Sequence, residues 1–189
     1  MHAGTNVRVA VDGIDAAGKT TLADELAGVL DRRSLPVARI SEDDYLRPRA
    51  ERYARGELSP EGYFLDSFDH DALHAAVLAA PAGALVVVDG VFLQRPELAD
   101  CWDVVVFVSV RPEEALRRAL ERDRGRFGRA TEERYRRRYQ PSQELYRRAV
   151  SPRERADLVL ENDDPARPRL VAGGRFGEWP RAPRPRTIA

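Results

Sequence analysis

The chain has 189 residues with 31 basic and 31 acidic side chains, so its formal net charge is zero. This length supports one domain with a single core and excludes a large multidomain machine. The balanced charge disfavours a globally basic nucleic-acid binder, and the longest apolar runs fall far short of the roughly 18 residues that a membrane span needs. The single cysteine rules out an internal disulfide and, with no N-terminal signal pattern, predicts a cytoplasmic protein.

One lysine stands apart in the composition. Every other member of the lysine and arginine count is arginine, and the exception is Lys19. An arginine bias follows from a GC-rich genome and says nothing about function. The exception indicates a position that needs a compact point charge on a flexible stem.

The first half of the chain predicts two strands and two helices around a loop. Residues 7–11 form a β-branched apolar run that predicts a buried strand, and apolar side chains at helical spacing predict a helix over 19–33. A second strand is expected at 37–41 after a proline. Residues 42–62 lack a sustained period, so we expect an exposed loop with a short helical piece. The alanine-rich segment 70–80 predicts the second helix.

The second half continues the same alternation. Apolar runs predict strands at 85–88 and 104–110, and a helix is expected to begin at Pro112 and to end near residue 122. A basic, glycine-broken segment follows, which we expect to form a mobile lid over about 122–131, before a further helix. A last strand is expected at 158–160.

Strands that are apolar on both faces and alternate with helices predict an α/β fold. We expect a three-layer domain over residues 1–163, with a five-stranded parallel sheet, helices on both faces and a small helical lid. The composition shifts to proline, glycine and arginine beyond residue 163, so residues 164–189 are expected to form a weakly ordered tail.

A phosphate-binding motif follows the first predicted strand. Residues 13–20 fit G-x-x-x-x-G-K-[ST], the Walker A loop, with a strand before it and a helix after it. In this motif main-chain N–H groups surround a phosphate, the lysine reaches the β- and γ-phosphates and the hydroxyl binds Mg²⁺. The expected ATP contacts are Gly13, Ile14, Asp15, Ala16, Ala17, Gly18, Lys19, Thr20 and Thr21. The motif predicts a P-loop NTPase fold with ATP and Mg²⁺ as its cofactors.

Acidic residues follow two of the other predicted strands. Asp43 and Asp44 come after the second strand and Asp89 ends the third. In a parallel sheet these positions lie at the carboxyl edge, beside the phosphate loop. Asp89 is therefore a candidate to support Mg²⁺ together with Thr20. The alternative interpretations are a solvated loop or helix cap for the first two acids and a simple turn for Asp89.

The order of the motifs resembles the uridine kinase-like branch of the P-loop kinases, which includes phosphoribulokinase and pantothenate kinase relatives. The resemblance spans residues 7–162, and it is carried by the phosphate loop, S-E-D-D-Y at 41–45, S-F-D-H at 67–70, V-D-G-V-F-L at 88–93, L-A-D-C-W-D at 98–103 and R-D at 122–123. It implies transfer of the ATP γ-phosphate to a hydroxyl of a small metabolite, with a nucleoside as the leading acceptor.

The resemblance also implies roles for individual residues. Asp43 becomes the catalytic base, acting with Lys19 and Arg122. The acceptor is expected to contact Asp43, Tyr45, Asp69 and His70. The lid arginines that clamp the transferring phosphate are expected to be Arg118, Arg122 and Arg126. The alternatives are a helix cap for Asp69 and a solvated helix surface for most of the arginines.

Two departures from the family pattern concern the acceptor and the metal. Residues 80–84 replace a longer insertion whose hairpin contacts the pyrimidine base in the family's nucleoside kinases, so a sugar or another non-nucleoside alcohol is the alternative acceptor. Asp89 also stands where the family usually has glutamate.

A further alternative is a nucleotide-binding regulatory protein without kinase activity, or a nucleic-acid partner, because arginines are dense between residues 111 and 155. Interleaved acids argue against a nucleic-acid surface. A small-molecule hydroxyl acceptor, with neither nucleic acid nor membrane as a partner, is therefore the expectation.

Overall fold

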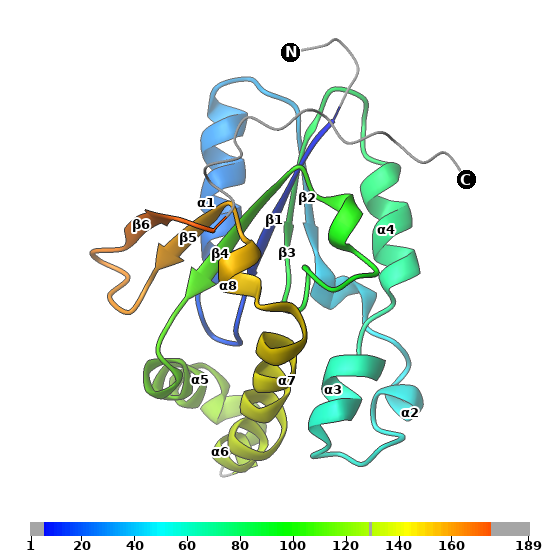
Figure 1. Ribbon diagram of the computed structural model, residues 1–189, viewed down its shortest axis with the longest axis vertical. Helices are drawn as coiled ribbons and strands as arrows, with labels where there is room; N and C mark the ends of the chain where they lie inside the picture. The colour runs from blue at the N-terminus through cyan, green and yellow to red at the C-terminus, as the bar shows by residue number, and fades with distance from the viewer. Residues whose placement is uncertain (1–5, 129, 175–189) are drawn as a thin grey trace.

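Six strands form one sheet in the computed structural model, which describes residues 6–128 and 130–174 (Figure 1). The strands are β1 (Val7–Gly13), β2 (Val37–Ser41), β3 (Leu85–Asp89), β4 (Val104–Ser109), β5 (Leu158–Glu161) and β6 (Arg169–Ala172). Their order is β2-β3-β1-β4-β5-β6; the first five run parallel, and β6 runs antiparallel to β5. The predicted α/β class is confirmed.

Helices and helical turns join the strands. The helices are α1 (Lys19–Arg32), α2 (Arg49–Arg52), α3 (Pro60–Asp66), α4 (His70–Leu78), α5 (Pro112–Phe127), α6 (Ala130–Arg134), α7 (Gln140–Val150) and α8 (Pro152–Arg155). The turns are the 3₁₀ turns η1 (Glu42–Tyr45) and η2 (Ala99–Cys101) and the π-helical turn η3 (Tyr135–Tyr139). The predicted loop over 42–62 therefore contains η1, α2 and the first turn of α3.

Helices cover both faces of the sheet. On one face, Leu73 of α4 shares a core cluster with Val86 of β3. On the other face, Ala23 of α1 and Ala115 of α5 share a cluster with Val87 of β3. Successive side chains of a strand point to opposite faces, so a strand covered on both sides is mostly apolar. This explains why the strands could be recognised in the sequence as apolar runs. The arginines within β1 and β2, Arg8 and Arg39, are paired with acids.

The carboxyl ends of the central strands meet at one edge of the sheet. The register pairs Ser41 of β2 and Val11 of β1 with the same residue, Asp89 of β3. The phosphate loop, η1 and the loop after β3 therefore begin side by side. In Figure 1 helices α3, α5, α6 and α7 lie below this edge.

The expected end of α5 near residue 122 is wrong, and the lid itself stays a prediction. Residues 123–127 continue α5, and the helix passes through Gly125 without a break. Gly128, with a φ of +57°, is where the helical backbone changes. A single glycine weakens a helix by only about 1 kcal/mol, which neighbouring helical residues and tertiary packing readily offset. The next helix begins at Ala130.

The expected five-stranded sheet and weakly ordered tail also need correction. The predicted domain boundary at residue 163 precedes β6, which pairs with β5 from Leu158–Ala172 to Glu161–Arg169. Leu170, Val171 and Ala172 form a short apolar run in β6, but they lie in a stretch rich in proline, glycine and arginine, and that composition led to the expectation of a tail. Residues 175–189 of the expected tail lie outside the described residues.

Candidate active site

The phosphate loop turns sharply between β1 and α1. Gly18 has a φ of +97°, and a Cβ atom there would lie 2.8 Å from the Asn162 side-chain nitrogen. A Cβ atom on Gly13 would lie 2.5 Å from the main-chain oxygen of Val108 on β4. Both positions therefore require glycine. The Lys19 ammonium is buried in the turn and donates to the Ile14 carbonyl at 2.8 Å.

The hydroxyl of the loop lies against the acid that ends β3. Thr20 Oγ1 donates to Asp89 Oδ2 at 2.5 Å, and Asp89 is only 3% exposed. The other oxygen of Asp89 lies 2.8 Å from Nη2 of Arg39, a residue of β2 that also pairs with Asp24 of α1. Arg39 was missed in the sequence because its partners belong to other strands and helices. The predicted pair of Thr20 and Asp89 is brought together as expected.

These two oxygen groups suit Mg²⁺. The ion takes oxygen ligands and is commonly held by one or two protein oxygens together with the phosphates of a nucleotide. Thr20 and Asp89 supply such a set at the end of the phosphate loop. Among the described residues, no group of three or more His, Cys, Asp or Glu side chains is placed to hold a metal by itself. A magnesium ion here would depend on the phosphates as well.

Asp43 faces the phosphate loop from η1. Partial burial raises the pKa of its carboxyl group, and the charges of Asp15 and Asp89 raise it further. The Lys19 ammonium and the Arg122 guanidinium act in the opposite direction on the same pKa. The carboxylate therefore lies within electrostatic range of the loop lysine, the Thr20–Asp89 pair and one predicted lid arginine. This is the arrangement expected of a base beside a phosphate.

Glu42 fixes the turn that carries Asp43. Its side chain is fully buried, and its Oε2 accepts from the Val91 main-chain N–H at 2.8 Å. A Cβ on Gly90 would lie 2.5 Å from that oxygen, so the glycine makes room for the acid. Burial raises the pKa of Glu42 to about 8. The sequence offered no signal for this role, because the partner lies 49 residues away.

The side chains of His70 and Tyr45 are packed against other parts of the protein. His70 Nε2 lies 3.9 Å from Glu42 Oε1, and burial lowers the histidine pKa. The Tyr45 ring packs against the hydrophobic core. Asp69 caps α4 by accepting from the Ala72 N–H at 2.9 Å, and its own N–H donates to the Tyr45 carbonyl at 2.8 Å. Their roles toward an acceptor stay predictions.

Two acids of the phosphate-loop region connect it to α3 and α7. Asp15 accepts from the Tyr63 hydroxyl of α3 and from the Gln143 amide of α7, both at 2.9 Å. Asp12 is fully buried and accepts from the Tyr146 hydroxyl of α7 at 2.5 Å. Burial raises the pKa of Asp12 to about 6. The helices beyond the sheet edge are therefore attached directly to the loop.

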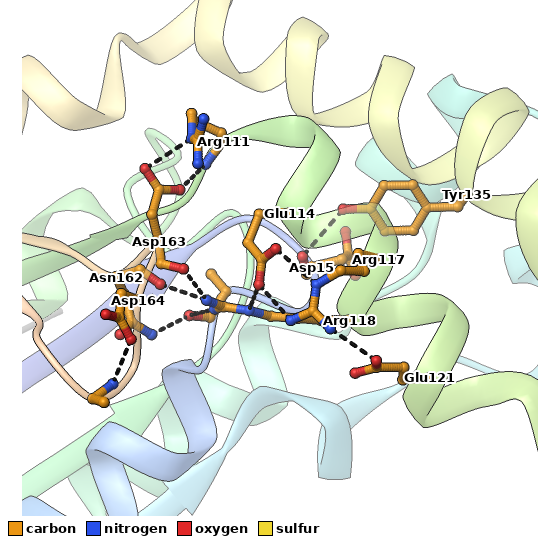
Figure 2. A network of polar contacts seen from close by, with 12 residues as sticks. Asp15, Arg111, Glu114, Arg117, Arg118, Glu121, Tyr135, Asn162, Asp163 and Asp164 are labelled. Atoms are coloured by element: carbon orange, nitrogen blue, oxygen red, sulfur yellow. Dashed lines mark hydrogen bonds and ion pairs between the residues drawn. The ribbon is translucent and has the colours of Figure 1, made fainter.

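The predicted lid arginines have different surroundings. Arg118 donates to Glu114 at 2.8 Å and to the main-chain oxygens of Asn162 and Asp163 at 2.7 and 3.0 Å, which joins α5 to the loop after β5 (Figure 2). Arg122 forms a two-bond pair with Asp123, both bonds at 2.7 Å. The Arg126 side chain lies outside the described part of the structure. The arginine with an electrostatic link to Asp43 is Arg122.

A cavity of about 530 Å³ lies between the end of β4 and helices α7 and α8. Its lining includes Ile14, Phe107, Tyr135, Pro141 and Tyr146 and is mostly apolar. Lys19, Thr20, Asp43 and Asp89 do not line it. We therefore place the phosphate chemistry at the sheet edge and not in this cavity.

Comparison with known proteins identifies the family. The family model for chloramphenicol phosphotransferase-like proteins matches residues 7–157, which contain the phosphate loop, Asp43 and Asp89. The chain belongs to this family. No curated protein matches the chain. Within the residues that the structure describes, no helix has the length and apolar character needed to cross a membrane.

Solved structures similar to this chloramphenicol phosphotransferase-like protein share its fold. One is a possible uridine kinase from Bacillus stearothermophilus, with a TM-score of 0.65, 22% identity and coverage of 84% of this chain and 90% of that chain. Another, described as a "putative fructose transport system kinase from Silicibacter sp. TM1040", has a TM-score of 0.65, 21% identity and the same two coverages. The fold is therefore that of P-loop kinases.

Proposed function

We propose that this chloramphenicol phosphotransferase-like protein is an ATP-dependent kinase that phosphorylates a hydroxyl group of a small molecule. The observation that carries the proposal is the position of Asp43, whose carboxylate is influenced by Lys19 and Arg122 across the phosphate loop. A protein that only binds a nucleotide does not need a base in this place. A kinase does, because the acceptor hydroxyl loses its proton during phosphoryl transfer.

Each group of residues at the site has its own role in the proposed phosphoryl transfer. The N–H groups of the loop and Lys19 hold the β- and γ-phosphates, and Thr20 and Asp89 hold Mg²⁺. When bound, the ion neutralises charge on the phosphate oxygens. Asp43 orients the acceptor hydroxyl and accepts its proton, and the raised pKa of Asp43 makes it a stronger base than an ordinary aspartate. Arg122 offsets negative charge at the transferring group.

The acceptor is proposed at the level of a small-molecule alcohol. A nucleoside is supported by the sequence resemblance, and the fold is shared with a possible uridine kinase. The family name adds chloramphenicol, itself an alcohol, as a compound to test. An ADP-release screen with Mg²⁺-ATP should therefore cover nucleosides, sugars, chloramphenicol and small hydroxy acids.

Asp43→Asn tests the proposed base. We expect ADP release with the best acceptor to fall about 10²- to 10⁴-fold, while ATP affinity changes little, because general-base catalysis contributes in this range. The matched control is Asp44→Asn, one residue further along η1, which should stay near wild-type activity. Lys19→Ala should weaken ATP binding as well as transfer. Unchanged turnover in Asp43→Asn, or ATP binding with no ADP release for any acceptor, would contradict the proposal.

A further inference from the structure

Four arginines surround the ring of one tyrosine, Tyr53. The ring of Tyr53, just after α2, has the guanidinium carbons of Arg138, Arg49, Arg52 and Arg134 at 4.7, 4.8, 5.6 and 5.9 Å from its centroid. Arg49 and Arg52 come from α2, Arg134 is the last residue of α6, and Arg138 belongs to η3. We call these four residues the Tyr53 arginine cluster. It joins two parts of the chain that are about 80 residues apart.

The cluster has more positive charge than its surroundings neutralise. Glu57 pairs with Arg134 at 3.0 Å and with Arg49 at 3.4 Å. Within the described residues, Arg138 donates to neutral oxygens: the carbonyls of Glu57, Ser59 and Arg52 and the hydroxyl of Ser67. Nearby acids are engaged elsewhere, with Glu51 on Arg47 and Asp66 on Arg55. The Glu57 carboxylate thus pairs with two of the four guanidinium groups, and within the described residues Arg52 and Arg138 have no acid partner.

Burial makes the excess positive charge of the Tyr53 arginine cluster unfavourable. Arg138 is only 2% exposed, and burial lowers its pKa. The buried Nε of Arg52 has no hydrogen-bond partner within the described residues. Charged and polar groups that are removed from water need a partner, so an arrangement of this kind is typical of a site that is completed by an anion.

Several exposed arginines elsewhere on the helices have acidic partners, unlike two of the four arginines in the Tyr53 arginine cluster. Each of several exposed arginines on α5, η3 and α7 pairs with an acid three or four residues away on its own helical segment: Arg117 with Glu114 and Glu121, Arg136 with Glu132, Arg137 with Glu133, and Arg147 and Arg148 with Glu144. Such pairs are ordinary helix surface. The Tyr53 arginine cluster departs from this pattern, so the general abundance of arginine does not explain it.

The cluster lies one aromatic layer away from the phosphate loop. The Arg138 guanidinium sits 5.2 Å from the ring centroid of Tyr63. The hydroxyl of that tyrosine donates to Asp15 in the loop at 2.9 Å. Tyr139, which packs edge-on against Tyr63 at 4.8 Å, adds to the same layer. The charge of Asp43 also acts on Tyr63, which places the base on this side of the loop.

We propose that the Tyr53 arginine cluster binds an anionic group of the acceptor, a carboxylate or a phosphate, at the far end from the hydroxyl that is phosphorylated. This inference rests on the proposed kinase function and favours, among the alcohols in the screen, those that carry an acid group over neutral nucleosides and chloramphenicol. The Glu57 carboxylate marks the binding position, because it already bridges Arg134 and Arg49. It comes from an exposed loop next to Gly56, whose φ is +102°, and the acceptor's acid group takes its place.

A binding experiment tests the anion site without any transfer. Wild-type protein saturated with Mg²⁺-ADP, which fills the phosphate loop, is titrated with sodium sulfate by calorimetry at constant ionic strength. We expect Arg134→Gln combined with Arg49→Gln to weaken sulfate binding at least 10-fold. Arg136→Gln, an exposed arginine on η3 that pairs with Glu132, should leave it unchanged. Glu57→Gln should tighten it several-fold, because the internal competitor is removed.

A kinetic experiment distinguishes an acceptor group from free phosphate. Paired acceptors that differ by an acid group, such as glycerol and glycerate, are compared in the same variants. We expect Arg134→Gln to raise KM at least 10-fold for the anionic member, with a smaller change in kcat and in the neutral member. Sulfate binding that ignores the variants, or acceptor kinetics that do not depend on the cluster, would overturn the inference. No ADP release with any acceptor would instead refute the kinase function, and sulfate binding would still report on the site.

Discussion

The Tyr146 hydroxyl shows how a single polar atom ties a helix to the phosphate loop. It donates to Asp12 Oδ2 at 2.5 Å and accepts from the Gln94 main-chain N–H at 2.9 Å. The Gln94 side chain donates to the same carboxylate oxygen at 3.0 Å. These bonds favour the ionised form of Asp12 against a larger effect of burial, which raises its pKa from 3.8 to about 6.

Tyr146→Phe should therefore destabilise the protein in a pH-dependent way. The lost hydroxyl leaves two buried groups short of a partner, at a cost of about 1–3 kcal/mol. Because the folded pKa of Asp12 is raised, the wild type loses stability as pH rises from about 4 to about 6. The variant lacks one donor to the carboxylate, so its pKa is higher and its loss continues above pH 6. Urea unfolding at pH 5.5 and pH 8 measures the difference.

Tyr135→Phe is the matched control for this prediction. Its hydroxyl donates to the main-chain carbonyl of Asp15 at 3.3 Å, a group that does not titrate. The loss of stability should be smaller and equal at the two pH values. An equal deficit for Tyr146→Phe at pH 5.5 and pH 8 would show that Asp12 is not the group it supports.

At the scale of elements, the sequence predicted strands β1 to β5, the phosphate loop and the start of α5, but it did not predict the end of α5. Buried parallel strands are mostly apolar, and the loop has a fixed spacing of residues that includes Lys19, so both are local signals. The end of a helix depends on competition between a weak glycine effect and the helix's contacts. Gly125 was therefore mistaken for a break, although α5 continues to Phe127.

The candidate site also combines residues that a local sequence pattern indicates with residues that no local pattern indicates. Asp43 and Asp89 were found because they follow strands, and the parallel sheet brings such positions together. Arg39, Glu42 and the Tyr53 arginine cluster were missed because their roles depend on partners distant in the chain. Glu42 pairs with a residue 49 positions away, and Arg134 with one 77 positions away. A pattern that is read along one segment does not contain these pairs.

Gly125→Ala and Gly128→Ala test the corrected course of α5. Gly125 is helical, and a Cβ atom there meets nothing within 4 Å, so alanine should stabilise the protein by about 0.5–1 kcal/mol. Gly128 has a φ of +57°, where alanine should cost about 1–2 kcal/mol. Thermal unfolding of both variants beside wild type measures the opposite signs. Changes near zero in both would contradict a helix that continues through Gly125 and ends at Gly128.

At the scale of the whole molecule, one edge of the sheet differs from the rest because its last strand, β6, is antiparallel. β1 to β5 follow the parallel order of the P-loop kinase fold, and β6 then covers the outer edge of β5 in the antiparallel direction. The family model ends at residue 157, before both β5 and β6. Leu170 of β6 is 62% exposed, so the strand adds little burial. Its main contribution is to occupy the hydrogen-bonding groups of an edge strand, which otherwise promote association between chains.

Shortening the chain after Gly174 or after Asp163 separates these contributions. A protein of residues 1–174 keeps β6 and is the reference for the comparison. A protein of residues 1–163 loses the backbone pairs of β6 and the bond from the Gly173 N–H to the Asp157 carbonyl, so it should be less stable by about 1–3 kcal/mol. It should also scatter more light on concentration, because β5 becomes an open edge. Equal stability and equal scattering in the two proteins would mean that β6 does not protect the sheet.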